Sequence, residues 1–156
     1  MKKSNLLFWI TVVPAIIIVF LISCNPEEEG MPWDGYEVTK MNYGNPVGYN
    51  IPNSLSNVNT GDIYWFYIDA ESDMTYSIRK NVIIVLPQSF AQFPASAEIT
   101  GYKEDGIVFG EKKPGEGVYN DWITYYSPID QKIYIQFKIT STAAGGGYLV
   151  FGYINE

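Results

Sequence analysis

The sequence has 156 residues and a formal net charge of −7, from 17 acidic and 10 basic side chains. This length predicts a single domain, and an acidic surface that repels phosphate backbones makes nucleic acid an unfavourable partner. The chain has no histidine and one cysteine, which removes the commonest general base and metal ligand and excludes a disulfide within the chain.

The N-terminal residues are ordered like a bacterial secretory signal. Two lysines precede an almost unbroken apolar run (Leu6 to Ile22), and small Ser23 stands before Cys24. The sequence Leu-Ile-Ser-Cys resembles the lipobox of bacterial lipoproteins. This resemblance implies cleavage before Cys24, diacylglycerol on its thiol and a fatty acid such as palmitate on its new amine. We therefore expect a signal peptide over 1–23, with an uncleaved signal anchor or ordinary secretion as alternatives.

Residues 24–31 are expected to form a flexible acidic tether, because three glutamates and few apolar residues occupy them. Removal of the leader takes away two lysines and no acid, so 8 basic and 17 acidic residues leave a net charge of −9. Membrane attachment is therefore expected through the N-terminal lipid. Asn25 differs from the aspartate that retains enteric lipoproteins at the inner membrane, which favours the outer membrane, on its periplasmic or its exposed side.

The next segment, residues 32–59, contains many turn-forming residues. We expect irregular structure here, with one short strand near 36–41. One interpretation of its aromatic residues is that they lie across the folded domain and cover it. These residues are Trp33, Tyr36, Tyr43 and Tyr49.

From Thr60 onward, runs of β-branched and aromatic residues alternate with turns. Glu104-Asp105-Gly106 between two apolar runs predicts a hairpin. Strict alternation along 131–140 places Ile133, Ile135, Phe137 and Ile139 on one face. The expected strands cover 62–68, 74–79, 82–86, 97–103, 107–110, 122–126, 131–140 and 148–154.

About eight or nine short strands without a helical period indicate an all-β fold, a jelly-roll-like antiparallel β-sandwich over 32–156. The order of segments over about 60–153 resembles the bacterial pre-peptidase C-terminal domain. The resemblance is carried by Asp-Ile-Tyr-Trp-Phe-Tyr-Ile at 62–68, by the segment 122–137 and by Gly-Tyr-Leu-Val at 147–150. It implies a small exported sandwich, some relatives of which bind protein, sugar polymers or calcium.

Two groups of residues are candidate sites. Asp69, Glu71 and Asp73 alternate in one turn and could bind calcium through oxygen ligands, although Met74 and Lys80 exclude an EF-hand; a solvated turn is the alternative. The second group consists of Trp33, Trp65 and Trp122, whose rings could bind a polysaccharide or an extracellular protein if exposed, or could fill the core.

No residue pattern predicts catalysis, since no histidine is present to activate a serine and no pair of carboxylates is marked by spacing. The sequence therefore predicts a lipid-anchored envelope or surface lipoprotein with a non-enzymatic binding or adhesion role. The alternatives are a carbohydrate-binding module that uses exposed Trp and Tyr rings, and a structural envelope protein without a small ligand. No cofactor is expected apart from calcium.

Overall fold

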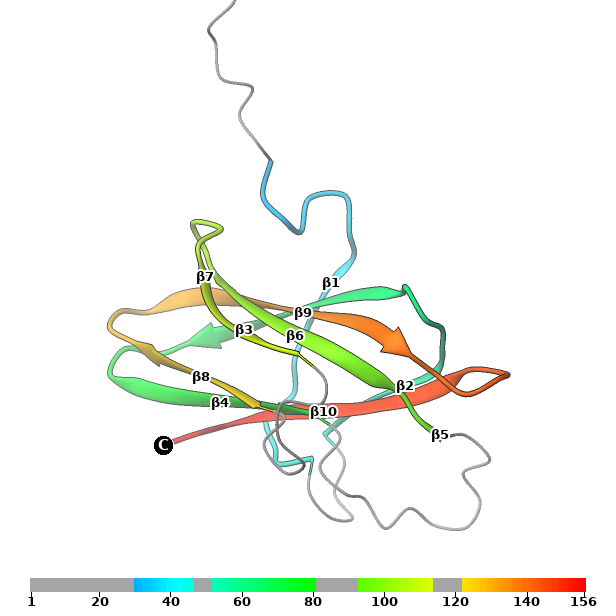
Figure 1. The fold of residues 1–156 in the computed structure, drawn as a ribbon. Coiled ribbons are helices and arrows are strands. Elements are labelled where there is room, and N and C mark those ends of the chain that lie inside the picture. The colour runs from blue at the N-terminus through cyan, green and yellow to red at the C-terminus, as the bar shows by residue number, and fades with distance from the viewer. Residues whose placement is uncertain (1–29, 47–51, 81–92, 114–121) are drawn as a thin grey trace, which may run out of the picture. The chain divides into compact units, whose positions relative to one another are not determined.

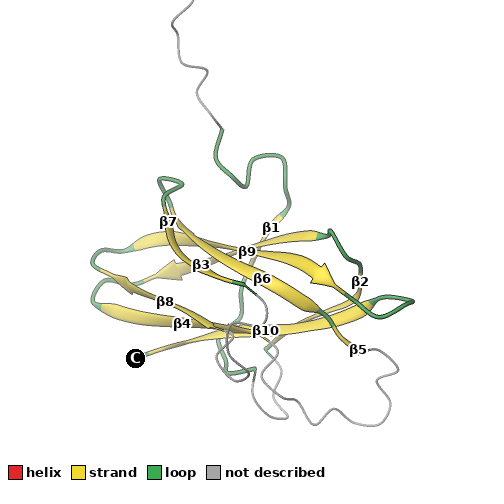
Figure 2. Ribbon diagram, in the orientation of Figure 1, coloured by secondary structure: helices red, strands yellow, loops and turns green. Residues whose placement is uncertain are grey.

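Two β-sheets packed face to face form the domain, as Figure 1 shows. The structure is a computed structural model that describes residues 30–46, 52–80, 93–113 and 122–156, and Met31–Glu156 is one compact unit. These residues contain strands, turns and loops and no helix (Figure 2), so none of their segments is a helix able to cross a membrane. The strands are β1 (Val38–Lys40), β2 (Asn53–Val58), β3 (Ile63–Ala70), β4 (Met74–Lys80), β5 (Phe93–Pro94), β6 (Ser96–Lys103), β7 (Val108–Lys112), β8 (Trp122–Ser127), β9 (Gln131–Ser141) and β10 (Gly147–Asn155).

Sheet A has the strand order β1-β3-β9-β6-β7, and sheet B has the order β2-β10-β4-β8, with β5 added beside β10. Most neighbouring strands are antiparallel; β1 with β3 and β5 with β10 are the parallel pairs within the described residues. Strands β2, β3 and β4 alternate between the sheets, as do β8, β9 and β10. This alternation confirms the jelly-roll-like sandwich predicted from the sequence.

The core lies between the sheets and is built from one face of each long strand. In β9, alternate residues from Ile133 to Ile139 are at most 1% exposed, which confirms the predicted alternation. Tyr76 and Ile78 of β4 face the same core. Burial of this many large side chains is the main term that stabilises the fold. The other large core residues are Met41, Val58, Phe66, Ile68, Ile99, Ile123, Tyr125, Leu149 and Phe151.

The predicted hairpin at Glu104-Asp105-Gly106 is confirmed, because β6 and β7 pair on either side of it. Gly106 has a φ of 80° and donates its amide to the Lys103 carbonyl at 3.0 Å. A side chain at this φ would be strained, which is why glycine suits the position. The Ile107 amide donates to the Asp105 carboxylate at 3.0 Å and completes the turn.

The segment before residue 60 holds more structure than its composition predicts. The short strand expected near 36–41 is β1, but β2 follows in a stretch predicted to be irregular. β2 has the sequence Asn-Ser-Leu-Ser-Asn-Val and becomes a strand by pairing with β10. Its conformation therefore depends on a distant partner and not on local propensity. The strand predicted over 82–86 lies outside the described residues.

Candidate functional site

The outer face of sheet A carries an aromatic cluster made of Trp33, Tyr36, Trp65, Tyr102 and Tyr134. The ring of Trp33 stacks on Tyr134 with centroids 3.8 Å apart and an interplanar angle of 7°. Trp65 meets the edge of Trp33 at 5.9 Å and lies 5.3 Å from Tyr102. The segment before β1 therefore covers this face of the sheet with Trp33 and Tyr36, as predicted for these two residues. Tyr43 instead contacts Tyr153 of β10, and Tyr49 lies outside the described residues.

The three candidate tryptophans do not form one exposed platform. Trp65 is 2% exposed, because Trp33, Tyr36 and Tyr102 surround it. Trp122 belongs to β8 of the other sheet, where Arg79 lies 5.5 Å from its ring centroid. A flat sugar-stacking surface needs coplanar rings on one face, and the structure brings only Trp33 and Trp65 together, edge to face.

The acidic turn after β3 does not gather its carboxylates around one point. Asp69 pairs with Lys40, whereas Asp73 accepts a hydrogen bond from the Tyr126 hydroxyl at 2.8 Å. At Glu71 the backbone amide donates to the Tyr76 hydroxyl at 2.7 Å. Within the described residues, no group of three or more potential ligands could hold a metal ion. Asp69 and Asp73 therefore bind side chains of β1 and β8 and do not meet at a common point.

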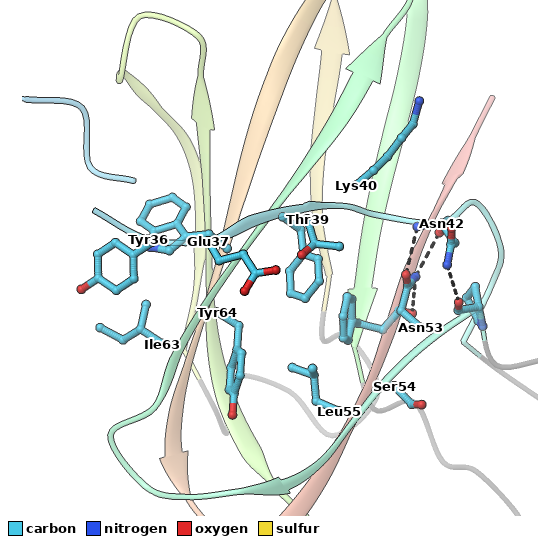
Figure 3. Close-up of a pocket in the computed structure, with 14 residues that line it drawn as sticks. Tyr36, Glu37, Thr39, Lys40, Asn42, Asn53, Ser54, Leu55, Ile63 and Tyr64 are labelled. Atoms are coloured by element: carbon cyan, nitrogen blue, oxygen red, sulfur yellow. Dashed lines mark hydrogen bonds between the residues drawn. The ribbon is translucent and has the colours of Figure 1, made fainter. Parts of the chain in front are cut away.

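A groove of about 540 Å³ opens between β1 and β2, where each sheet ends in an edge strand. The apolar floor includes Leu55, Phe66 and Phe151. Figure 3 shows β1 and the residues before it on one rim, and the start of β2 on the other. An apolar floor with a few polar groups is typical of ligand-binding sites, which measure roughly 300–1,000 Å³. The rim residues are Tyr36, Glu37, Thr39, Lys40, Asn53 and Ser54.

Hydrogen bonds close one end of the groove and join its rims. Asn53 accepts from the Asn42 amide at 3.0 Å, and its side-chain nitrogen donates to the carbonyls of Asn42 and Phe151, each at 3.1 Å. The Asn42 side chain donates to the Pro52 carbonyl at 3.1 Å. We call this set of bonds the asparagine clamp. It fixes the start of β2 against the chain that follows β1.

The turn between β2 and β3 closes the opposite end. Asp62 accepts hydrogen bonds from the Asn59 amide at 2.8 Å and from the Tyr64 hydroxyl at 3.1 Å. Burial raises the pKa of Tyr64, and the hydrogen bond to Asp62 raises it further. The phenol therefore stays neutral near pH 7 and acts as a fixed donor.

The charges at the rim are arranged asymmetrically. Glu37 points its carboxylate into the groove, whereas Lys40 points away from it (Figure 3). The Lys40 ammonium is bonded to Asp69, and this hydrogen bond, with the Asp69 charge, raises the pKa of Lys40. Glu37 has no ion pair within the described residues. The groove therefore presents a negative charge above an apolar floor.

Sequence reasoning did not single out Glu37, Asn53 or Leu55, although they are central to the groove. These residues come together because β1 and β2 are edge strands on the same side of the sandwich, one in each sheet. A single sequence carries no local signal for this arrangement. Of the predicted sites, Cys24 lies outside the described residues.

Comparison with known proteins gives no close match. No family model matches the chain, and neither does any curated protein. Among solved structures, it is similar to PliG of Aeromonas hydrophila, a periplasmic lysozyme inhibitor of g-type lysozyme, with 11% identity and a TM-score of 0.40 over 77% of this chain and 96% of that chain. It is also similar to the pre-peptidase C-terminal domain of a Bacillus anthracis collagenase, with 11% identity and a TM-score of 0.40 over 76% and 95%. Similarity at this level does not transfer function.

Proposed function

We propose that this chain is a lipid-anchored envelope protein whose β-sandwich binds a protein partner in the groove between β1 and β2, without catalysis. The observation that carries the proposal is the groove itself, with its apolar floor between two sheet edges. Edge strands offer unpaired backbone groups to an extended segment. An extracellular or periplasmic protein that carries such a segment is the class of partner that fits.

The chemistry of the groove favours binding over catalysis. Among the described residues that line the groove, Glu37 is the one carboxylate, so they do not form the pair of carboxylates that glycoside hydrolysis uses. The sequence has no histidine to activate a nucleophile. The aromatic rings at the groove are Tyr36, Tyr64, Trp65, Phe66 and Phe151. Burial of Trp65 and Phe66 leaves little of their surface to stack on a polysaccharide.

The anchor would place this binding domain at the bacterial envelope. The lipobox-like sequence before Cys24 and the acidic residues after it support attachment by lipid and not by a basic surface. Every large buried residue of the described core lies at or after Met41, so residues 24–156 contain that whole core. The domain can therefore be studied without its leader.

Binding can be tested by selecting peptides from a display library on residues 24–156, with a glycan array in parallel. Thr39→Trp fills the exposed rim of the groove, and Thr124→Trp adds the same ring to the exposed face of sheet B. We expect selected peptides to lose binding to Thr39→Trp and to keep it on Thr124→Trp. Binding to glycans alone, or equal loss with both variants, would refute the proposal.

Anchoring is tested by labelling cells with a palmitate analogue. Cys24→Ala is expected to lose the label and to leave the membrane fraction, whereas Ser23→Ala, with another small residue before the cysteine, is expected to keep both. Unchanged membrane association of Cys24→Ala without label would indicate an uncleaved helix in place of a lipid anchor.

A further inference from the structure

We infer that the occupant of the groove is an extended segment that pairs with β2 along the edge facing away from β10 and places a basic side chain against Glu37. The inference rests on the proposed function, because it names the kind of segment bound at the same site. It is carried by three features: the composition of the β2 edge, the apolar floor, and the unpaired charge on the opposite rim.

β2 is an edge strand without the usual protection against pairing. Within the described residues it pairs only with β10, and its six residues include no charged side chain and no proline. The edge strand β7, in contrast, carries Glu111 and Lys112. Charged residues and prolines at sheet edges hinder the addition of another strand. β2 therefore lacks this protection, as does the edge strand β8 (Trp122–Ser127), and of these two strands β2 is the one that lines the groove.

The floor of the groove defines one set of side chains in the added strand. Alternate residues of a strand point to the same face, so every second side chain of the segment would face Leu55, Phe66 and Phe151. Leu55 is half-buried and supplies accessible apolar surface, whereas Phe66 and Phe151 are 7% and 1% exposed and lie in the core cluster below it. Apolar side chains of moderate size at these alternate positions are the ones that gain from burial there.

The opposite rim defines the charge of the segment. The Glu37 carboxylate points into the groove, and the neighbouring Lys40 is engaged by Asp69 and points away (Figure 3). Glu37 is exposed and forms no ion pair within the described residues. The full sequence carries a net charge of −7, which attracts cations over longer distances. A lysine or arginine that reaches across from the β2 side complements this carboxylate.

The test uses residues 24–156 and defined peptides in which threonine and valine alternate around a central lysine, measured by fluorescence anisotropy at low salt. A second peptide has glutamate in place of the lysine. Glu37→Lys should weaken the lysine peptide by up to about fivefold, as expected for an exposed ion pair, and should improve the glutamate peptide. Glu104→Lys makes the same charge change at the β6–β7 turn and controls for net charge.

Pairing with β2 is tested separately by methylating single backbone nitrogens of the lysine peptide. Strand addition predicts that affinity falls at every second position, because alternate amides face the partner strand. A uniform response to methylation, or equal effects of Glu37→Lys and Glu104→Lys, would overturn the inference while leaving a protein-binding groove intact. If the display selection also yields no groove-dependent peptide, the proposed function itself fails.

Discussion

Gly152 of β10 lies where the strand passes closest to the chain that follows β1. A Cβ atom at this position would lie 2.5 Å from Pro52 Cγ and closer still to the Gly44 carbonyl oxygen. The second contact is with backbone, and the Gly44 amide is already held by the Tyr153 carbonyl at 2.8 Å. Relief of the clash must therefore move Gly44 away from β10 or bend the strand. Overpacking of this kind costs about 1–3 kcal/mol.

Gly152→Ala is therefore expected to lower the free energy of unfolding by about 1–3 kcal/mol, as measured by urea denaturation of residues 24–156 at constant m-value. Gly110→Ala is the matched control, because its Cβ would lie 3.4 Å from the Ile123 side chain, an ordinary contact. Replacing a strand glycine without a clash stabilises by roughly 0.5–1 kcal/mol. If Gly152→Ala were as stable as the wild-type domain, the close approach of Gly44 to β10 would be refuted.

Three further predictions concern stability. Trp65→Phe should cost less than the roughly 3–5 kcal/mol of Trp65→Ala, because the buried indole nitrogen of Trp65 has no hydrogen-bond partner to lose; equal losses in urea denaturation would contradict this. Burial raises the pKa values of Tyr148 and Tyr153, so the unfolded chain releases these protons first. The free energy of unfolding should therefore stay constant up to about pH 10 and fall above it. The fall should be less steep in Tyr148→Phe. Identical pH profiles of this variant and the wild-type domain would refute the assignment to Tyr148. Asn53→Ala removes the three hydrogen bonds that the Asn53 side chain makes in the asparagine clamp. It should cost about 1–3 kcal/mol and weaken peptides selected on the groove, whereas unchanged affinity would show that the clamp does not shape the site.

The parts of the fold that the sequence predicts are those set by local patterns. The Asp-Gly turn at 105–106 and the alternation along β9 each fix a structure within about a dozen residues, and both are confirmed. β2 could not be predicted from a local pattern, because its conformation depends on pairing with β10, which follows it by about 90 residues. Propensity is a weak guide where pairing with a distant strand decides the conformation.

The candidate site is even less predictable from local sequence patterns than the fold. Trp65 is recognisable from sequence as a large aromatic residue in a strand, but its burial depends on Trp33 arriving over sheet A. Glu37 is one of 17 acidic residues, and only the groove distinguishes it from the others. Composition therefore predicts the class of molecule, whereas the placement of two edge strands determines where it can bind.

The asparagine clamp has a mechanical consequence for a domain held by its N-terminus. Under the proposed function, tension between an anchor at Cys24 and a partner in the groove would enter the domain at Met31 and pass along the segment that contains β1. From Asn42 it crosses to Asn53 of β2 through the clamp, so the load path runs along one side of the sandwich. Hydrogen bonds also join β1 to β3 and β2 to β10, so each sheet would take up part of the load through its edge strand. Under the proposed function, the clamp would thus be the direct link between the anchored segment and the strand that holds the partner.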